Sequence, residues 1–114
     1  MISRQNRFHG HRSLNYVYGK GQAVKGESLS LRYAANKRAD YRLAVVVSRK
    51  VSKLAVVRNR IRRRIYEIVR QHRQESKDDW RKDLVISVFD ERIAKMPADE
   101  LRSSVLKLFE KAGL

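Results

Sequence analysis

The spacing of hydrophobic positions changes along the chain, and each change predicts a new element. Leu14, Val17 and Tyr18 are spaced as on one helical face, which predicts a short helix over residues 12–19. Alternating apolar and polar positions predict strands over residues 22–24 and 27–33. The β-branched run at residues 45–47 predicts a strand over residues 41–48 that is buried on both faces. We expect this strand to form a hairpin with the strand over residues 27–33.

In the second half of the chain the spacing predicts a helix, a strand and a second helix. Four apolar residues recur at spacings of four, four and three and predict a helix over about residues 54–73: Val57, Ile61, Ile65 and Ile68. Alternation predicts a strand over residues 84–89. A last helix is expected to have Pro97 at its first position and to end at Gly113. Its predicted apolar stripe consists of Leu101, Val105, Leu108 and Phe109.

These elements predict an α+β fold with the order α-β-β-β-α-β-α and one mixed sheet packed by helices. The 114 residues fit a single domain over residues 1–114, and residues 1–9 are expected to form a mobile N-terminal tail. The chain has no cysteine, so disulfides and thiolate metal sites are excluded and a cytoplasmic location is favoured. The apolar run at residues 43–47 is far shorter than the ~20 residues of a membrane-spanning helix. We therefore expect no membrane partner.

Positive charge is the strongest functional signal in the composition. Lys and Arg total 27 against 12 Asp and Glu, which gives a formal net charge of +15. Residues 49–73 hold ten Lys and Arg but a single acid, Glu67. A compact fold must hold this charge against its own repulsion, so a polyanionic partner is expected.

The predicted central helix arranges these cations around its apolar stripe. With ~100° per residue, Leu54 falls with the stripe, Arg58 and Arg60 border it, and Asn59 points away. Arginines at the border of a buried stripe can rest their stems on the core and present guanidinium groups to phosphates. Like charges four residues apart, as in Arg60 and Arg64, destabilise a helix unless an anion neutralises them.

Other cations of this segment fall into two groups. Arg49, Lys50 and Lys53 lie just before the helix, where backbone N–H groups and the helix dipole favour anions. Arg63 and Arg70 are spaced to form ion pairs with Glu67. We therefore expect these two arginines to have a larger role in stabilising the helix.

The strings SRK at residues 48–50 and AVVRNRIRR at residues 55–63 resemble the signature of the bacterial ribonuclease P protein subunit. The length, the basic composition and the element order fit that family along nearly the whole chain. The resemblance implies that a separate catalytic RNA, using Mg²⁺ bound mainly by RNA, removes the 5′ leader of precursor tRNA. The protein itself would carry no catalytic residue. The resemblance also implies a left-handed crossover between parallel strands, against the usual handedness.

The resemblance assigns two surfaces, with the catalytic RNA and precursor tRNA as partners. The resemblance puts Arg58, Asn59, Arg60, Arg62 and Arg63 against the catalytic RNA. Arg49, Lys50 and Lys53 before the helix and Arg64 at the border of its stripe complete the expected RNA-binding residues by their position. The cleft for the single-stranded leader would contain Leu14, Tyr18 and Arg32. Leu14 stands where the family usually has an aromatic residue, and Tyr18 offers a ring one helical turn later.

Two other classes of function compete with this one. A protein-borne active site would need a nucleophile, base and orienting group, but His9, His11 and His72 are scattered and lack metal-ligand spacing. A general RNA-binding or ribosomal protein would explain the charge and leave the match at residues 55–63 accidental. No zinc, heptad or helix-turn-helix pattern supports a DNA-binding module.

Overall fold

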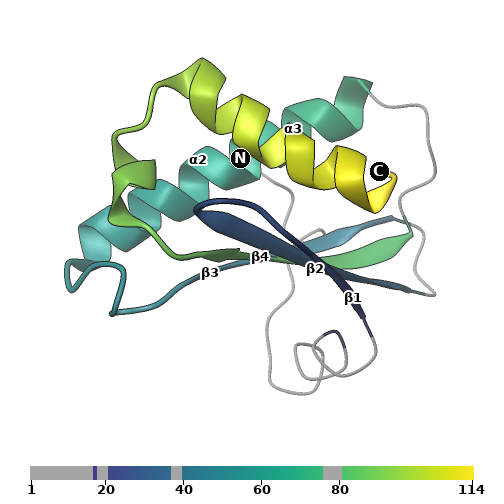
Figure 1. Cartoon of the computed structure of the whole chain (residues 1–114), viewed down its shortest axis with the longest axis horizontal. Coiled ribbons are helices and arrows are strands. Elements are labelled where there is room, and N and C mark those ends of the chain that lie inside the picture. The colour runs from purple at the N-terminus through teal and green to yellow at the C-terminus, as the bar shows by residue number, and fades with distance from the viewer. Residues whose placement is uncertain (1–16, 18–20, 37–39, 76–80) are drawn as a thin grey trace.

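The alternating segments form one four-stranded mixed sheet in the computed structural model, which describes residues 17, 21–36, 40–75 and 81–114 (Figure 1). The strands are β1 (Gln22–Lys25), β2 (Leu29–Ala35), β3 (Arg42–Val47) and β4 (Lys82–Val88). Their order in the sheet is β1-β2-β4-β3. β4 runs antiparallel to β2 and parallel to β3. The expected hairpin of β2 with β3 is therefore wrong, because β4 lies between them and pairs with both.

Two long helices cover one face of this sheet (Figure 1). They are α2 (Ala55–Glu75) and α3 (Ala98–Ala112), and the short 3-10 helix η2 (Glu91–Ala94) follows β4. The predicted order is confirmed from β1 onward, with η2 as an unpredicted addition. The predicted first helix lies outside the described residues except for Val17. The α+β class with a mixed sheet is confirmed, and the left-handed crossover stays a prediction.

The core lies between the sheet and the two helices. Alternate residues of the three longer strands point into it: Leu29, Leu31, Leu43, Val45, Leu84 and Ile86. All four residues of the stripe predicted for α3 are buried, as are Ile61 and Ile65 of α2. On the opposite face of the sheet, Val17 is buried with Ala44 and Val85. β3 is thus covered on both faces, as its apolar run predicts.

The helix boundaries correct two details of the predicted pattern. Leu54 is 61% exposed, although the helical spacing of ~100° per residue predicts that it belongs to the buried stripe. Because α2 begins at Ala55, helical geometry does not extend to Leu54. Toward the other end of α2, Val69 continues the buried stripe. Pro97 is the N-cap of α3 and not its first helical residue. Gly113 ends that helix with a φ of 77°, the left-handed conformation that favours glycine.

The parallel pair β3 and β4 decides what lies beside the start of α2. Val47 and Val88 are partners at the carboxyl ends of the two strands, so the chain leaves both strands at the same end of the sheet. Residues 48–54 lead from there into α2, and η2 begins shortly after β4 at the same edge. Consequently η2 contacts α2. This topology brings the Ile93 and Met96 carbonyls to Arg64, which lies 29 and 32 positions earlier in the chain.

Candidate nucleic-acid interface

Five of the cations expected to bind RNA are exposed and have no partner within the described part of the chain. Neither a hydrogen bond nor an ion pair holds any of these five, which we call the unpaired cations: Arg49, Lys50, Lys53, Arg60 and Arg63. Three lie in or next to the connection before α2, and two lie on the solvent side of its first half. Their charge is available to an external anion.

Three other arginines of the predicted site are held within the fold, and we call them the tethered arginines. Arg58 donates through Nη1 to the Ser52 carbonyl at 2.9 Å. Arg62 donates to Asn59 Oδ1 at 2.7 Å and to the Val47 carbonyl at 3.5 Å. All three of Arg58, Arg62 and Arg64 are partly buried. They retain their charge, but part of their donor capacity fixes α2 to neighbouring segments.

Arg64 ties α2 to the turn that follows η2. Its Nη1 donates to the Ile93 carbonyl at 2.7 Å. Its Nη2 donates to the Met96 carbonyl. A planar guanidinium can satisfy two carbonyl oxygens at once, so one side chain orders both ends of this turn.

The wheel prediction for residues 58–60 holds in outline. Asn59 is exposed, as expected for an outward position, and its amide oxygen accepts from Arg62. Arg58 is half-buried and Arg60 is exposed on the other side of the helix. The two arginines therefore border the stripe, but only Arg60 belongs to the unpaired cations.

The connection before α2 is shaped by Ser52. This serine is only 6% exposed. Its hydroxyl oxygen accepts from the Leu54 backbone N–H at 3.3 Å, directly ahead of the first helical turn. A turn closed by the Val51 N–H and the Ser48 carbonyl at 3.1 Å precedes it. The side chains of Arg49 and Lys50 lie on this turn and are exposed.

The second half of α2 is electrostatically different from the first. Arg70 forms an ion pair with Glu67 at 2.9 Å, which confirms the predicted role of Arg70 in stabilising the helix. Hydrogen bonding from Arg70 is the largest cause that lowers the pKa of Glu67 to about 2. Arg73 pairs with Asp40 at 3.3 Å. Arg63, which was also expected to pair with Glu67, is instead one of the unpaired cations, so uncompensated charge gathers in the first half of the helix.

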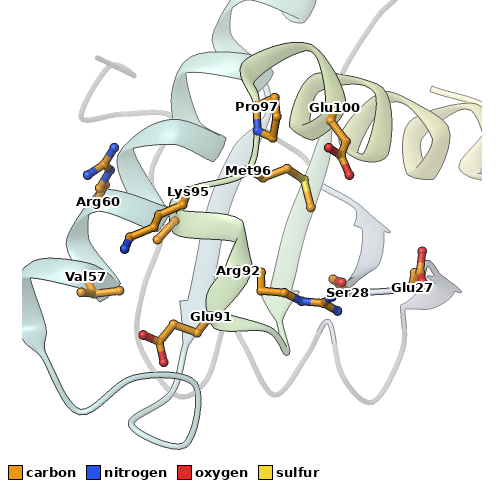
Figure 2. Close-up of a pocket in the computed structure, with 11 residues that line it drawn as sticks. Glu27, Ser28, Val57, Arg60, Glu91, Arg92, Lys95, Met96, Pro97 and Glu100 are labelled. Atoms are coloured by element: carbon orange, nitrogen blue, oxygen red, sulfur yellow. The ribbon is translucent and has the colours of Figure 1, made fainter.

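A cavity of about 710 Å³ opens between the first half of α2, η2 and the start of α3 (Figure 2). Val57 and Arg60 line it from α2, and Lys95 and Met96 line it from the turn after η2. The sequence pattern does not place Lys95 among the RNA-binding residues, because it is distant in sequence from the basic helix. Only the contact of η2 with α2 reveals that it belongs to the same surface.

The predicted leader cleft lies partly outside the described residues. Leu14 and Tyr18 fall there. Arg32 is described and is the register partner of Val85, so it lies on the sheet face turned away from α2 and α3. Val85 packs against Val17 on that face. The position of Arg32 therefore agrees with a surface next to the predicted first helix.

The structure assembles no evident catalytic or metal site from the residues it describes. Within residues 21–36, 40–75 and 81–114, no three His, Asp or Glu side chains come together to hold a metal ion. His72 stacks on Phe109 with ring centroids 5.4 Å apart, and burial is the main cause that lowers the pKa of its imidazole. No described helix has the length and apolar character needed to span a membrane.

Comparison with known proteins gives one consistent result. The family model described as Ribonuclease P matches residues 2–113. The chain is 42% identical over 79 residues to the ribonuclease P protein component of Pseudanabaena, covering 68% of both chains. It is 28% identical to that of Syntrophomonas wolfei, over 100% of this chain and 92% of the relative.

Solved structures agree with the sequence matches. The RNase P protein of Staphylococcus aureus superposes with a TM-score of 0.80 at 25% identity, over 94% of each chain. The RNase P protein of Thermotoga maritima shares the fold, with a TM-score of 0.78 at 21% identity over 92% of this chain and 96% of that one. The chain belongs to the ribonuclease P protein family.

Proposed function

We propose that this chain, as the protein component of ribonuclease P, binds the catalytic RNA through the first half of α2 and the connection before it. The observation that carries this assignment is the cluster of unpaired cations, since a helix with uncompensated like charges is stabilised when phosphates lie against it. The tethered arginines keep α2 and its flanking segments in place. The chemistry of hydrolysis is assigned to the RNA, as the family resemblance implies.

Magnesium enters this proposal through the RNA partner. Two RNAs that approach one another repel through their phosphates, and Mg²⁺ ordinarily screens that repulsion. A protein with a net charge of +15 supplies part of the same screening. We therefore expect the protein to lower the magnesium concentration that the catalytic RNA requires, while the Mg²⁺ ions themselves are bound mainly by RNA. The cysteine-free composition supports action in the cytosol.

The second proposed partner is precursor tRNA, held by its single-stranded 5′ leader. The support is the sheet face that carries Arg32, next to the buried Val17. Leu14 and Tyr18 neighbour Val17 in sequence and are the side chains proposed to complete this surface. Single-stranded RNA is commonly bound by aromatic rings that stack on bases and by cations that contact its backbone.

The leader assignment predicts that Tyr18→Ala weakens the binding of precursor tRNA more than that of mature tRNA. Removing one base-stacking ring should cost ~1–3 kcal/mol for the leader-bearing substrate and nothing comparable for mature tRNA. The measurement is the Kd of each tRNA for the assembled RNA–protein complex, with Tyr18→Phe as the matched control that keeps the ring. Equal losses for the two tRNAs would remove Tyr18 from the leader surface.

A further inference from the structure

The cavity beside α2 is polarised between its two ends. Figure 2 shows Arg60 and Lys95 at the end formed by α2, and Glu27 and Glu100 at the opposite end near α3. Glu91 lies below Lys95 and beside Val57, on the α2 side of the view. The α2 end thus has two cations and one carboxylate and the opposite end has two carboxylates, so an anion is attracted more strongly to the α2 end.

Two cations at the α2 end face the same space without an internal partner. Lys95 extends from its turn toward α2, the helix that presents Arg60 (Figure 2). Both side chains are exposed, and within the described part of the chain neither forms a hydrogen bond or an ion pair. Arg92 lines the same cavity but is committed to Asp90, with N–O distances of 2.8 and 2.6 Å. Among the cations that line the cavity, Arg60 and Lys95 are therefore the two available to an external anion.

The position of Lys95 is set by Arg64. The two carbonyl groups that accept from Arg64 belong to Ile93 and Met96, so Lys95 sits on the turn between its two attachment points. Arg60 lies one helical turn before Arg64 on α2, which places these two arginines on neighbouring parts of one face. Arg64 therefore fixes the turn that carries Lys95 to the helix that carries Arg60.

We propose that Arg60 and Lys95 form a clamp for one backbone phosphate of the catalytic RNA, and that Arg64 is the positioning residue of this clamp. The clamp rests on the proposed function and extends its RNA surface from α2 onto the turn between η2 and α3. A phosphate between the two cations forms charge-assisted hydrogen bonds with both and relieves their repulsion. RNA is the favoured source of the phosphate because Arg60 shares the first half of α2 with Arg63, another of the unpaired cations.

The test is the salt dependence of the affinity of Lys95→Ala for the catalytic RNA. Loss of one phosphate contact should reduce the log–log slope by about one. A roughly fourfold rise in salt concentration should then shrink the affinity advantage of the wild-type protein by about fourfold. Lys107→Ala removes the same charge from an exposed position on α3 and is the matched control. A Lys95→Ala slope equal to that of Lys107→Ala would overturn the clamp.

A second measurement asks whether the two cations share a phosphate. If they do, replacing Lys95 in an Arg60→Ala background should change the affinity less than replacing it in the wild-type protein. Full additivity of the two replacements would contradict a shared phosphate. Failure of the proposed function itself looks different, because the wild-type protein would then bind the catalytic RNA no more tightly than an unrelated RNA of equal length.

Discussion

Replacing Asp83 with alanine is expected to destabilise the fold by about 3 kcal/mol or more, the largest stability loss expected for any polar residue that the structure describes. Asp83 is only 4% exposed. Its carboxylate accepts from Arg42 Nε at 2.9 Å, from Arg42 Nη2 at 2.6 Å and from Asn36 Nδ2 at 2.9 Å. The variant removes the carboxylate that pairs with the Arg42 guanidinium, whose side chain is only 17% exposed, across the adjacent strands β3 and β4. The free energy of unfolding in urea measures this loss.

Glu75→Ala is the matched control for Asp83→Ala, because it also removes one carboxylate that pairs with an arginine. Arg102 Nη2 lies 3.1 Å from Glu75 Oε2. The Arg102 side chain is 33% exposed and the Glu75 side chain is 67% exposed. Water screens such a pair, so its loss should cost under ~1 kcal/mol. Similar losses for the two variants would show that burial of the Arg42–Asp83 pair is not what makes it important.

Replacing Arg60 and Arg63 together with alanine is expected to have the largest effect on RNA binding. Both are unpaired cations on the first half of α2, and each is expected to contact about one phosphate. The log–log slope of affinity for the catalytic RNA against salt should fall by about two, and a roughly fourfold rise in salt should shrink the wild-type advantage about 16-fold. Binding titrations over a range of salt concentrations measure both quantities.

The control for this double variant is a protein with Lys107 and Lys111 replaced by alanine. It loses the same formal charge from α3, where the proposed RNA surface does not reach. Its slope should stay near the wild-type value, and its unfolding free energy should show that both variants remain folded. If both double variants lowered the slope equally, net charge and not the α2 surface would govern binding.

Local patterns in the sequence were enough to predict most of the elements. The stripes of α2 and α3 follow the helical period, and the strands follow alternation or the β-branched run at residues 45–47. These signals are local because each residue's burial depends on the face it occupies within its own element. The pairing of strands is not local. β2 was assigned to β3 because they are consecutive, whereas β4, some 40 positions later, pairs with both.

The candidate site shows the same division. Residue types and spacing predicted which cations surround α2, and even that Asn59 points outward. They could not separate Arg60 from Arg58, because the partner of Arg58 is a backbone carbonyl in the preceding connection. They could not reveal Lys95 either, since its place depends on two carbonyl groups that face Arg64 only after the sheet has assembled.

The family match also decides between the functions that the sequence left open. A ribosomal or general RNA-binding role would have explained the charge alone. The family model covers residues 2–113 and so includes the strands and α3 as well as the basic helix. The resemblance seen at residues 55–63 is therefore one part of a similarity that extends along the chain.

Cleavage of precursor tRNA at low magnesium tests the central claim most directly. The purified protein is added to the ribonuclease P RNA of its own organism at a magnesium concentration where the RNA alone is nearly inactive. The account predicts that the protein restores release of the 5′ leader, because its cations replace part of the screening that Mg²⁺ provides. Cleavage that stays at the level of the RNA alone would contradict it.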